Sequence, residues 1–163
     1  MRKTIASTFA FLALTLSAAA AFAEAKTDAD AKITYEVPAG FTTETKDNIT
    51  AISEPKNEIA FFVVKTNAKD ADKAMGELEQ VLNALFKDPK PVSGPTKSTY
   101  NGMKAVQMKA TATYEGKPVN VTLRFLETPS GKYVVVVGAY LTAKKEQLKD
   151  TFNKFYNSFK PVT

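Results

Sequence analysis

Hydrophobic positions along the chain follow two periods, and the switches between them outline the secondary structure. Residues 33–37 (ITYEV) alternate between apolar and polar side chains, as a strand with one buried face does. Residues 59–65 (IAFFVVK) and 132–141 (KYVVVVGAYL) are almost continuously apolar, which is typical of strands covered on both faces. Residues 48–53 (NITAIS) predict a further short strand. The run at 132–141 is too short to span a bilayer as a helix, so we expect a central strand.

The segment between residues 96 and 141 predicts strands linked by tight turns. Apolar residues recur there at every second position, as on one face of a strand. Asn101-Gly102, Glu115-Gly116 and 128–131 (TPSG) carry residue types that favour turns. Such short connections join antiparallel neighbours, so the sheet is predicted to be antiparallel. The side chains expected to face outward from the strand near residue 122 are Asn120, Thr122 and Arg124.

Two amphipathic helices complete the pattern. The first has apolar residues at three- and four-residue spacing from Ala71 to Phe86, with Asn67 or Asp70 as a possible N-cap and Pro89 as a stop. The second is predicted to begin at the cap residue Thr142. Its apolar positions form one stripe, which indicates core packing rather than an aromatic platform for a ligand. The stripe is Leu148, Phe152, Phe155, Tyr156 and Phe159, and the lysines expected on the opposite face are Lys144, Lys145, Lys149 and Lys154.

This order of elements predicts an α+β fold. We expect an antiparallel sheet of about six to seven strands with helices on both faces, formed by a single domain over residues 32–163. Residues 24–31 (EAKTDADA) are small and charged without periodicity, and they predict a flexible leader.

The first 23 residues have the three parts of a signal peptide. Arg2 and Lys3 supply positive charge, an apolar stretch follows, and Ala21-Phe22-Ala23 fits signal peptidase, with cleavage expected between Ala23 and Glu24. The alternative is an uncleaved membrane anchor, which the weak hydrophobicity of the segment disfavours. We therefore expect a periplasmic or secreted protein without stable membrane insertion of the mature chain.

Composition excludes several kinds of chemistry. Removal of Arg2 and Lys3 lowers the formal charge from +5 to +3, and the remaining lysines form no dense run, so nucleic-acid binding is not expected. The sequence contains no histidine and no cysteine. Zinc, copper and haem sites, a cysteine nucleophile and a Ser-His-Asp triad are therefore not expected. The closest carboxylate pairs, such as Asp70 and Asp72, do not continue into a calcium loop. No cofactor, metal site or catalytic residue is predicted.

Two places are candidates for a partner surface. Prolines between Lys87 and Pro95 restrict the unbound chain and reduce the entropy lost on binding; the alternative is a stiff connection after the first helix. Arg124, the only arginine after cleavage, is suited to clamping a carboxylate or phosphate, although a cross-strand or helix-facing ion pair is the alternative. The residues of this candidate surface are Lys87, Asp88, Pro89, Lys90, Pro91, Val92 and Arg124.

Short stretches of the chain resemble PsbP-like and Mog-type domains. The stretch 35–41 (YEVPAGF), the hairpin at Asn101-Gly102 and the ending 155–162 (FYNSFKPV) are similar to the opening, a later hairpin and the closing helix of these domains. The resemblance implies an αβα sandwich and a role in binding partners or assisting assemblies rather than catalysis. Phe41 stands where such domains often have Trp, and no histidine is present for a His-based metal site. No functional residue is carried over.

Three functions remain open at this level. The first is an exported, non-catalytic module that binds a protein or an envelope component. The second is a small-ligand carrier, which a concave pocket lined by Tyr35, Tyr114, Tyr140 or Tyr156 with a converging polar group would favour. The third is an enzyme that uses carboxylates, Ser/Thr or Tyr, which two carboxylates facing one cleft would favour.

Overall fold

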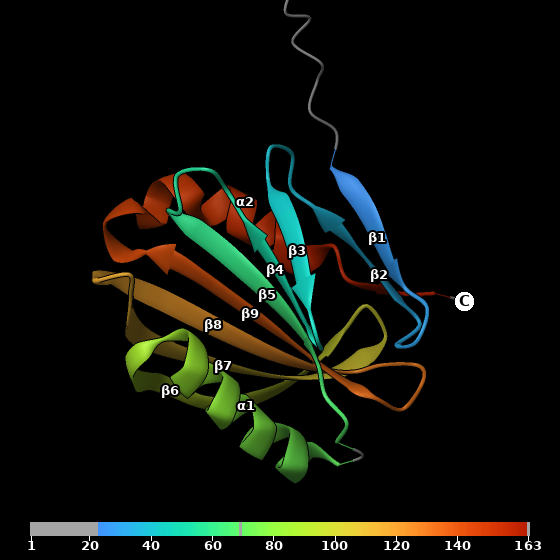
Figure 1. Cartoon of the computed structure of the whole chain (residues 1–163). Helices are drawn as coiled ribbons and strands as arrows, with labels where there is room; N and C mark the ends of the chain where they lie inside the picture. Colours follow the sequence, from blue (N-terminus) through green and yellow to red (C-terminus); the bar gives the residue numbers. More distant parts are fainter. Residues whose placement is uncertain (1–22, 69, 163) are drawn as a thin grey trace, which may run out of the picture.

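A computed structural model describes residues 23–68 and 70–162, and its main feature is a seven-stranded antiparallel sheet (Figure 1). The predicted signal peptide therefore lies outside the described residues, apart from Ala23. The strand order is β3-β4-β5-β9-β8-β7-β6, which confirms the predicted α+β class and antiparallel sheet. The strands are β3 (Thr42–Lys46), β4 (Ile49–Ser53), β5 (Ile59–Lys65), β6 (Lys87–Tyr100), β7 (Met103–Tyr114), β8 (Lys117–Glu127) and β9 (Tyr133–Leu141).

The tight turns lie where the sequence predicts them. Asn101 and Gly102 join β6 to β7 with φ values of 46° and 83°, and Glu115 and Gly116 join β7 to β8 with 49° and 77°. Two consecutive positive φ values match the right-handed twist of the flanking strands. These turns bring β6, β7 and β8 together as neighbours.

Two helices cover opposite faces of the sheet, as predicted (Figure 1). On β5, Phe61 and Val63 belong to the core beneath α2 (Lys145–Asn157), whereas Phe62 and Val64 belong to the core beneath α1 (Ala71–Leu85). The continuous apolar run of β5 is explained by this arrangement, because both of its faces are buried.

The caps of the helices were only partly predicted. Asp70 caps α1, since its carboxylate accepts a hydrogen bond of 2.9 Å from the Lys73 N–H. Thr142 does not cap α2. It begins the short 3₁₀ helix η1 (Thr142–Lys144), and its hydroxyl accepts a 3.1 Å hydrogen bond from the Asn120 amide instead.

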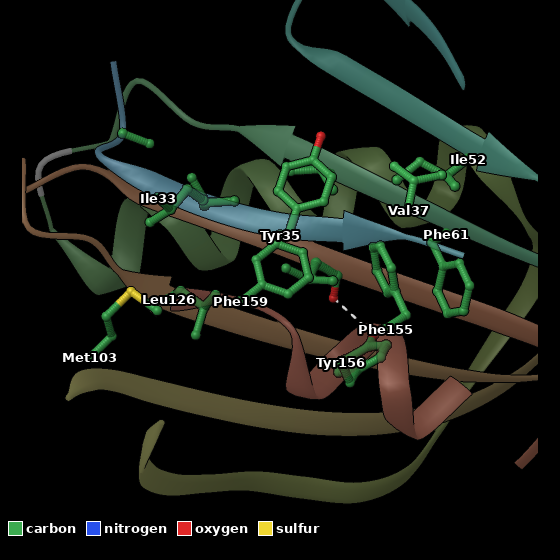
Figure 2. Close-up of a cluster of buried hydrophobic side chains, with 14 of the residues drawn as sticks. Ile33, Tyr35, Val37, Ile52, Phe61, Met103, Leu126, Phe155, Tyr156 and Phe159 are labelled. Atoms are coloured by element: carbon green, nitrogen blue, oxygen red, sulfur yellow. Dashed lines mark hydrogen bonds between the residues drawn. The ribbon is translucent and has the colours of Figure 1, made fainter. Parts of the chain in front are cut away.

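Phe155, Tyr156 and Phe159 of the predicted aromatic stripe are buried in the core, as expected, whereas Leu148 and Phe152 are only partly buried (Figure 2). Phe155 is 1% exposed and stacks on Phe61, with ring centroids 4.0 Å apart. Tyr35 on β2 (Ile33–Val37) stacks on Phe159 at 4.9 Å. The first contact attaches α2 to β5, and the second attaches the segment that follows α2 to β2.

The flexible leader expected over residues 24–31 is not observed, because a strand occupies most of it. Strand β1 (Glu24–Asp28) pairs antiparallel with β2, and β10 (Lys160–Pro161) completes a separate three-stranded sheet. Main-chain hydrogen bonds do not require apolar side chains, so the polar composition of β1 concealed it. The polar strand β3 was missed for the same reason.

Residues 87–95 form a strand, so the alternative of a stiff connection after the first helix is wrong. They belong to β6, an exposed edge strand whose pairing with β7 shifts register at three places. Prolines and bulges are common on edge strands because they disturb pairing with other chains.

Candidate binding groove beside the last helix

The face of the sheet beneath α2 is apolar in one half and polar in the other. A helix about 10 Å wide covers roughly two strands spaced about 4.8 Å apart, and α2 packs over β5 and β9. On the middle parts of β7 and β8 the same face carries polar side chains, whereas Met103, Ala105 and Leu126 near one end belong to the core. Gln107 pairs with Arg124 and Lys109 with Thr122 across the two strands, so their side chains form one patch.

Helix α2 adds a polar row beside this patch. Lys145, Lys149, Asn153 and Asn157 follow one another at four-residue intervals, so they share one side of the helix. This side adjoins the aromatic stripe and faces the strands β7 and β8. The expectation that Lys145 and Lys149 lie opposite the stripe is wrong, because the structure places both on the flank next to it.

Patch and helix together enclose a cavity of about 490 Å³, which we call the basic groove. Its cationic residues are Lys109, Arg124, Lys145 and Lys149. Its uncharged polar residues are Gln107, Asn120, Thr122, Asn153 and Asn157. Its apolar and aromatic residues are Val92, Ala110, Val121, Tyr140, Phe152 and Tyr156.

Arg124 is held in a fixed position on the floor of the basic groove. Its guanidinium donates a 2.8 Å hydrogen bond to the carbonyl oxygen of Tyr156 and a 3.1 Å bond to the side-chain oxygen of Gln107. The carbon at the centre of the guanidinium lies 4.1 Å from the centroid of the Tyr100 ring and 4.8 Å from that of Tyr156. Both distances fit cation–π contacts. Arg124 is therefore half-buried and positioned before any ligand arrives.

The partners of Arg124 are neutral, which corrects one expectation. Arg124 does bridge the strand and the helix, but within residues 23–68 and 70–162 it makes no ion pair. The other three cations of the groove also lack ion pairs in this part of the chain, and no described carboxylate lines the groove. The charged side chains that line the groove are thus all positive, which attracts anionic groups.

Tyr156 closes the floor of the groove and is not suited to proton transfer. Burial raises the pKa of its phenol well above the usual range, and the nearby Arg124 charge offsets this only in part. Its hydroxyl donates to main-chain carbonyl oxygens of the sheet, those of Thr122 and, at 3.0 Å, Val136. The phenol therefore stays protonated and holds α2 onto β8 and β9.

The structure brings only two of the predicted surface residues together. Val92 of β6 is 65% exposed and lies at the rim of the basic groove, whose floor contains Arg124. The remaining candidates, Lys87, Asp88, Pro89, Lys90 and Pro91, lie along β6 and do not line the groove. The four-residue polar row of α2 was the sequence signal that could have revealed the second wall.

A second cavity of about 660 Å³ lies between the start of α1 and strands β6 to β9. It brings Asp72 and Glu127 to one cleft, which is the arrangement named above as favouring an enzyme. Glu127, however, is paired with Lys104 at 3.3 Å, and Asp72 lies in the first turn of α1, where it complements the helix dipole. Both carboxylates therefore have structural explanations.

Two further observations concern metal ions and membranes. In the part of the chain that the structure describes, no three His, Cys, Asp or Glu side chains are grouped to share a metal ion. Among the helices of these residues, none combines the length and the apolar character needed to cross a bilayer.

Solved structures are similar to the chain, whereas family models and curated proteins are not. No sequence family and no curated protein matches it. The cyanobacterial PsbP protein of Synechocystis sp. PCC 6803 has a similar structure, with a TM-score of 0.63 and 10% identity over 86% of this chain and 93% of that one. LpqN, involved in cell envelope biogenesis of Mycobacterium tuberculosis, is similar with a TM-score of 0.55 and 17% identity, over 78% of this chain and 82% of that one. The Ran-binding protein Mog1p of Saccharomyces cerevisiae is similar with a TM-score of 0.53 and 12% identity, over 86% of this chain and 96% of that one.

Identities this low establish the fold alone. The similarity nevertheless spans most of both chains, and it agrees with the large antiparallel sheet and the two helices described above. The chain has the fold of a PsbP-like domain.

Proposed function

We propose that this protein is an exported, non-catalytic module that binds a protein or an envelope component through the basic groove. The observation that carries the proposal is the set of four unpaired cations around a concave surface that no described carboxylate lines. Surface lysines usually alternate with acidic residues, whereas here one sign of charge is concentrated in a groove.

Two lines of support come from outside the groove. The amino-terminal segment has the features of a cleaved signal peptide, which supports export. Proteins of the same fold include a Ran-binding protein and one involved in cell envelope biogenesis. These roles are theirs, and they make a binding module of this fold reasonable.

A carrier of small anions is the second candidate. Tyr140 and Tyr156 line the basic groove and Arg124 converges on it, which is the arrangement that favours a carrier. The volume of about 490 Å³ also falls in the range of small-molecule sites, roughly 300–1,000 Å³.

Site-specific crosslinking in the native envelope tests the proposal. A photo-reactive amino acid at Asn153 should give a defined adduct with a macromolecule, and Arg124→Gln in the same chain should abolish it. The same probe at Glu79, which is exposed on α1 and outside the groove, is the matched control.

Equal adducts from Asn153 and Glu79 would mean that the groove is not the binding surface. A small acidic molecule that copurifies with the protein, detected by native mass spectrometry and lost in the Arg124→Gln variant, would favour the carrier.

A further inference from the structure

The helix wall of the basic groove carries polar side chains at four-residue intervals along an elongated row. The lining residues of α2 run from Lys145 to Asn157, which is about 18 Å along the helix axis at 1.5 Å per residue. An extended peptide advances about 3.3 Å per residue, so five to six residues would fill this length. A compact anion would contact only one end of it.

The spacing of the lysines matches that of an extended chain. Lys145 and Lys149 are four residues apart, so their Cα atoms are separated by about 6 Å along the helix. Alternate side chains on one face of a strand are separated by about 6.6 Å. Carboxylates at alternate positions of a bound peptide therefore reach both lysines at once.

Uncharged amides follow the lysines on the helix wall, and they distinguish a peptide from other polyanions. Asn157 accepts a 2.8 Å hydrogen bond from the Tyr100 hydroxyl, which leaves its amide nitrogen as a donor. The side chain of Asn153 makes no hydrogen bond within the described residues. Peptide main chains offer both N–H donors and C=O acceptors to such amides, whereas phosphate groups offer acceptors only.

From these observations we propose that the basic groove binds an extended acidic segment of a partner protein, with carboxylates at alternate residues. Lys145 and Lys149 bind carboxylates from the helix side, and Arg124 and Lys109 bind them from the sheet side. Arg124 uses two of its five N–H donors within the protein, so it can still bind a carboxylate. The inference rests on the proposed function and assigns the chemistry of the ligand.

The test uses the exported, processed protein and two fluorescent hexapeptides of identical composition. One alternates glutamate and threonine, and the other has the order Glu-Glu-Thr-Thr-Glu-Thr, in which no two glutamates are two residues apart. Fluorescence anisotropy at low ionic strength should show that the alternating peptide binds roughly 5-fold or more tightly, because only its carboxylates match the lysine spacing. Added salt should weaken this binding.

Charge-matched variants locate the site. Lys145→Gln with Lys149→Gln should weaken binding of the alternating peptide roughly 3- to 20-fold, as expected for two solvent-accessible ion pairs. Lys154→Gln with Lys160→Gln removes the same charge outside the groove and should change affinity less than about 2-fold. Thermal unfolding of each variant establishes that the fold is retained.

Several results would overturn the inference. Equal affinity for the two peptides, or equal losses in the two double variants, would indicate nonspecific attraction. If polyphosphate or anionic phospholipid vesicles bind to the groove more tightly than the alternating peptide, the ligand carries phosphate groups and not a row of carboxylates. The proposed function would still stand in that case, provided that the probe at Asn153 gives its crosslink. Loss of that crosslink would overturn the proposed function itself.

Discussion

Gly138 on β9 shows how a single residue positions the last helix. A Cβ atom at this position would lie 2.6 Å from ring atoms of both Phe152 and Tyr156, closer than side chains tolerate. The half-exposed Phe152 can move, but Tyr156 is buried and its hydroxyl is bonded to the sheet. Glycine is therefore required because α2 crosses the sheet in close contact with the backbone of β9.

Gly138→Ala should destabilise the protein by about 1–3 kcal/mol, since overpacking displaces α2. Denaturant unfolding measures the change. Gly76→Ala is the matched control, because nothing lies within 4 Å of a Cβ atom there and alanine favours helix α1. A Gly138→Ala variant as stable as Gly76→Ala would show that the helix is not held against the strand.

At the scale of elements, the small sheet depends on one ionised side chain. The carboxylate of Asp28, at the end of β1, accepts a 3.0 Å hydrogen bond from the Ala31 N–H and forms a 3.0 Å ion pair with Lys65 of β5. Burial alone would raise the pKa of Asp28, but the hydrogen bond and the Lys65 ammonium outweigh it and lower this pKa. Asp28 thus links the three-stranded sheet to the large sheet.

The direction of this pKa shift determines how the stability of the protein depends on pH. Because the pKa is lower in the folded state than the ordinary value of 3.8, the ionised carboxylate stabilises the protein above that pH. The contribution is lost as the pH falls through the lowered pKa of the folded state. Asp28→Asn should therefore be less stable than the parent at pH 6, and the difference should shrink toward pH 2.

Urea unfolding of both proteins at several pH values checks this expectation. Amide exchange in β1 adds a local readout, since the Asp28→Asn change should accelerate exchange there more than in β8. A stability difference that stays constant down to pH 2 would contradict the role of the charged carboxylate.

At the scale of the whole molecule, the first strand within residues 23–68 begins where cleavage is predicted. Strand β1 starts at Glu24, and Glu24 pairs with Val37 of β2. We therefore expect the mature protein to begin at Glu24 and to be recovered from the exported soluble fraction. N-terminal sequencing of protein isolated from its native cells measures this, and a chain that still begins at Met1 in the membrane pellet would refute it.

Local patterns in the sequence predicted most of the secondary structure. The two-sided burial of β5 and β9, the turn at Asn101-Gly102 and the buried stripe of α2 were all predicted correctly. Each depends on residues close together in the chain, whose spacing or φ preference determines the local conformation. The dependence on neighbouring residues also explains the errors. Strands β1 and β3 are polar, and only their pairing with β2 and β4 reveals them as strands.

The basic groove could be predicted only in fragments. Arg124 and Val92 were named from the sequence, but the groove also needs Gln107 from β7 and the polar row of α2. These groups come from distant parts of the chain and meet only when β7 and β8 pair and α2 packs on β9. Val92, by contrast, was chosen within a supposed loop that proved to be an edge strand.

The sequence by itself determined the class of fold, the antiparallel order of the hairpins and the absence of histidine and cysteine side chains. It did so because periodicity, turn residues and composition are properties of the chain alone. The tertiary structure decided which polar residues share a surface. Whether a lysine is paired, solvated or directed at a groove depends on what lies across from it, and packing between distant segments determines that.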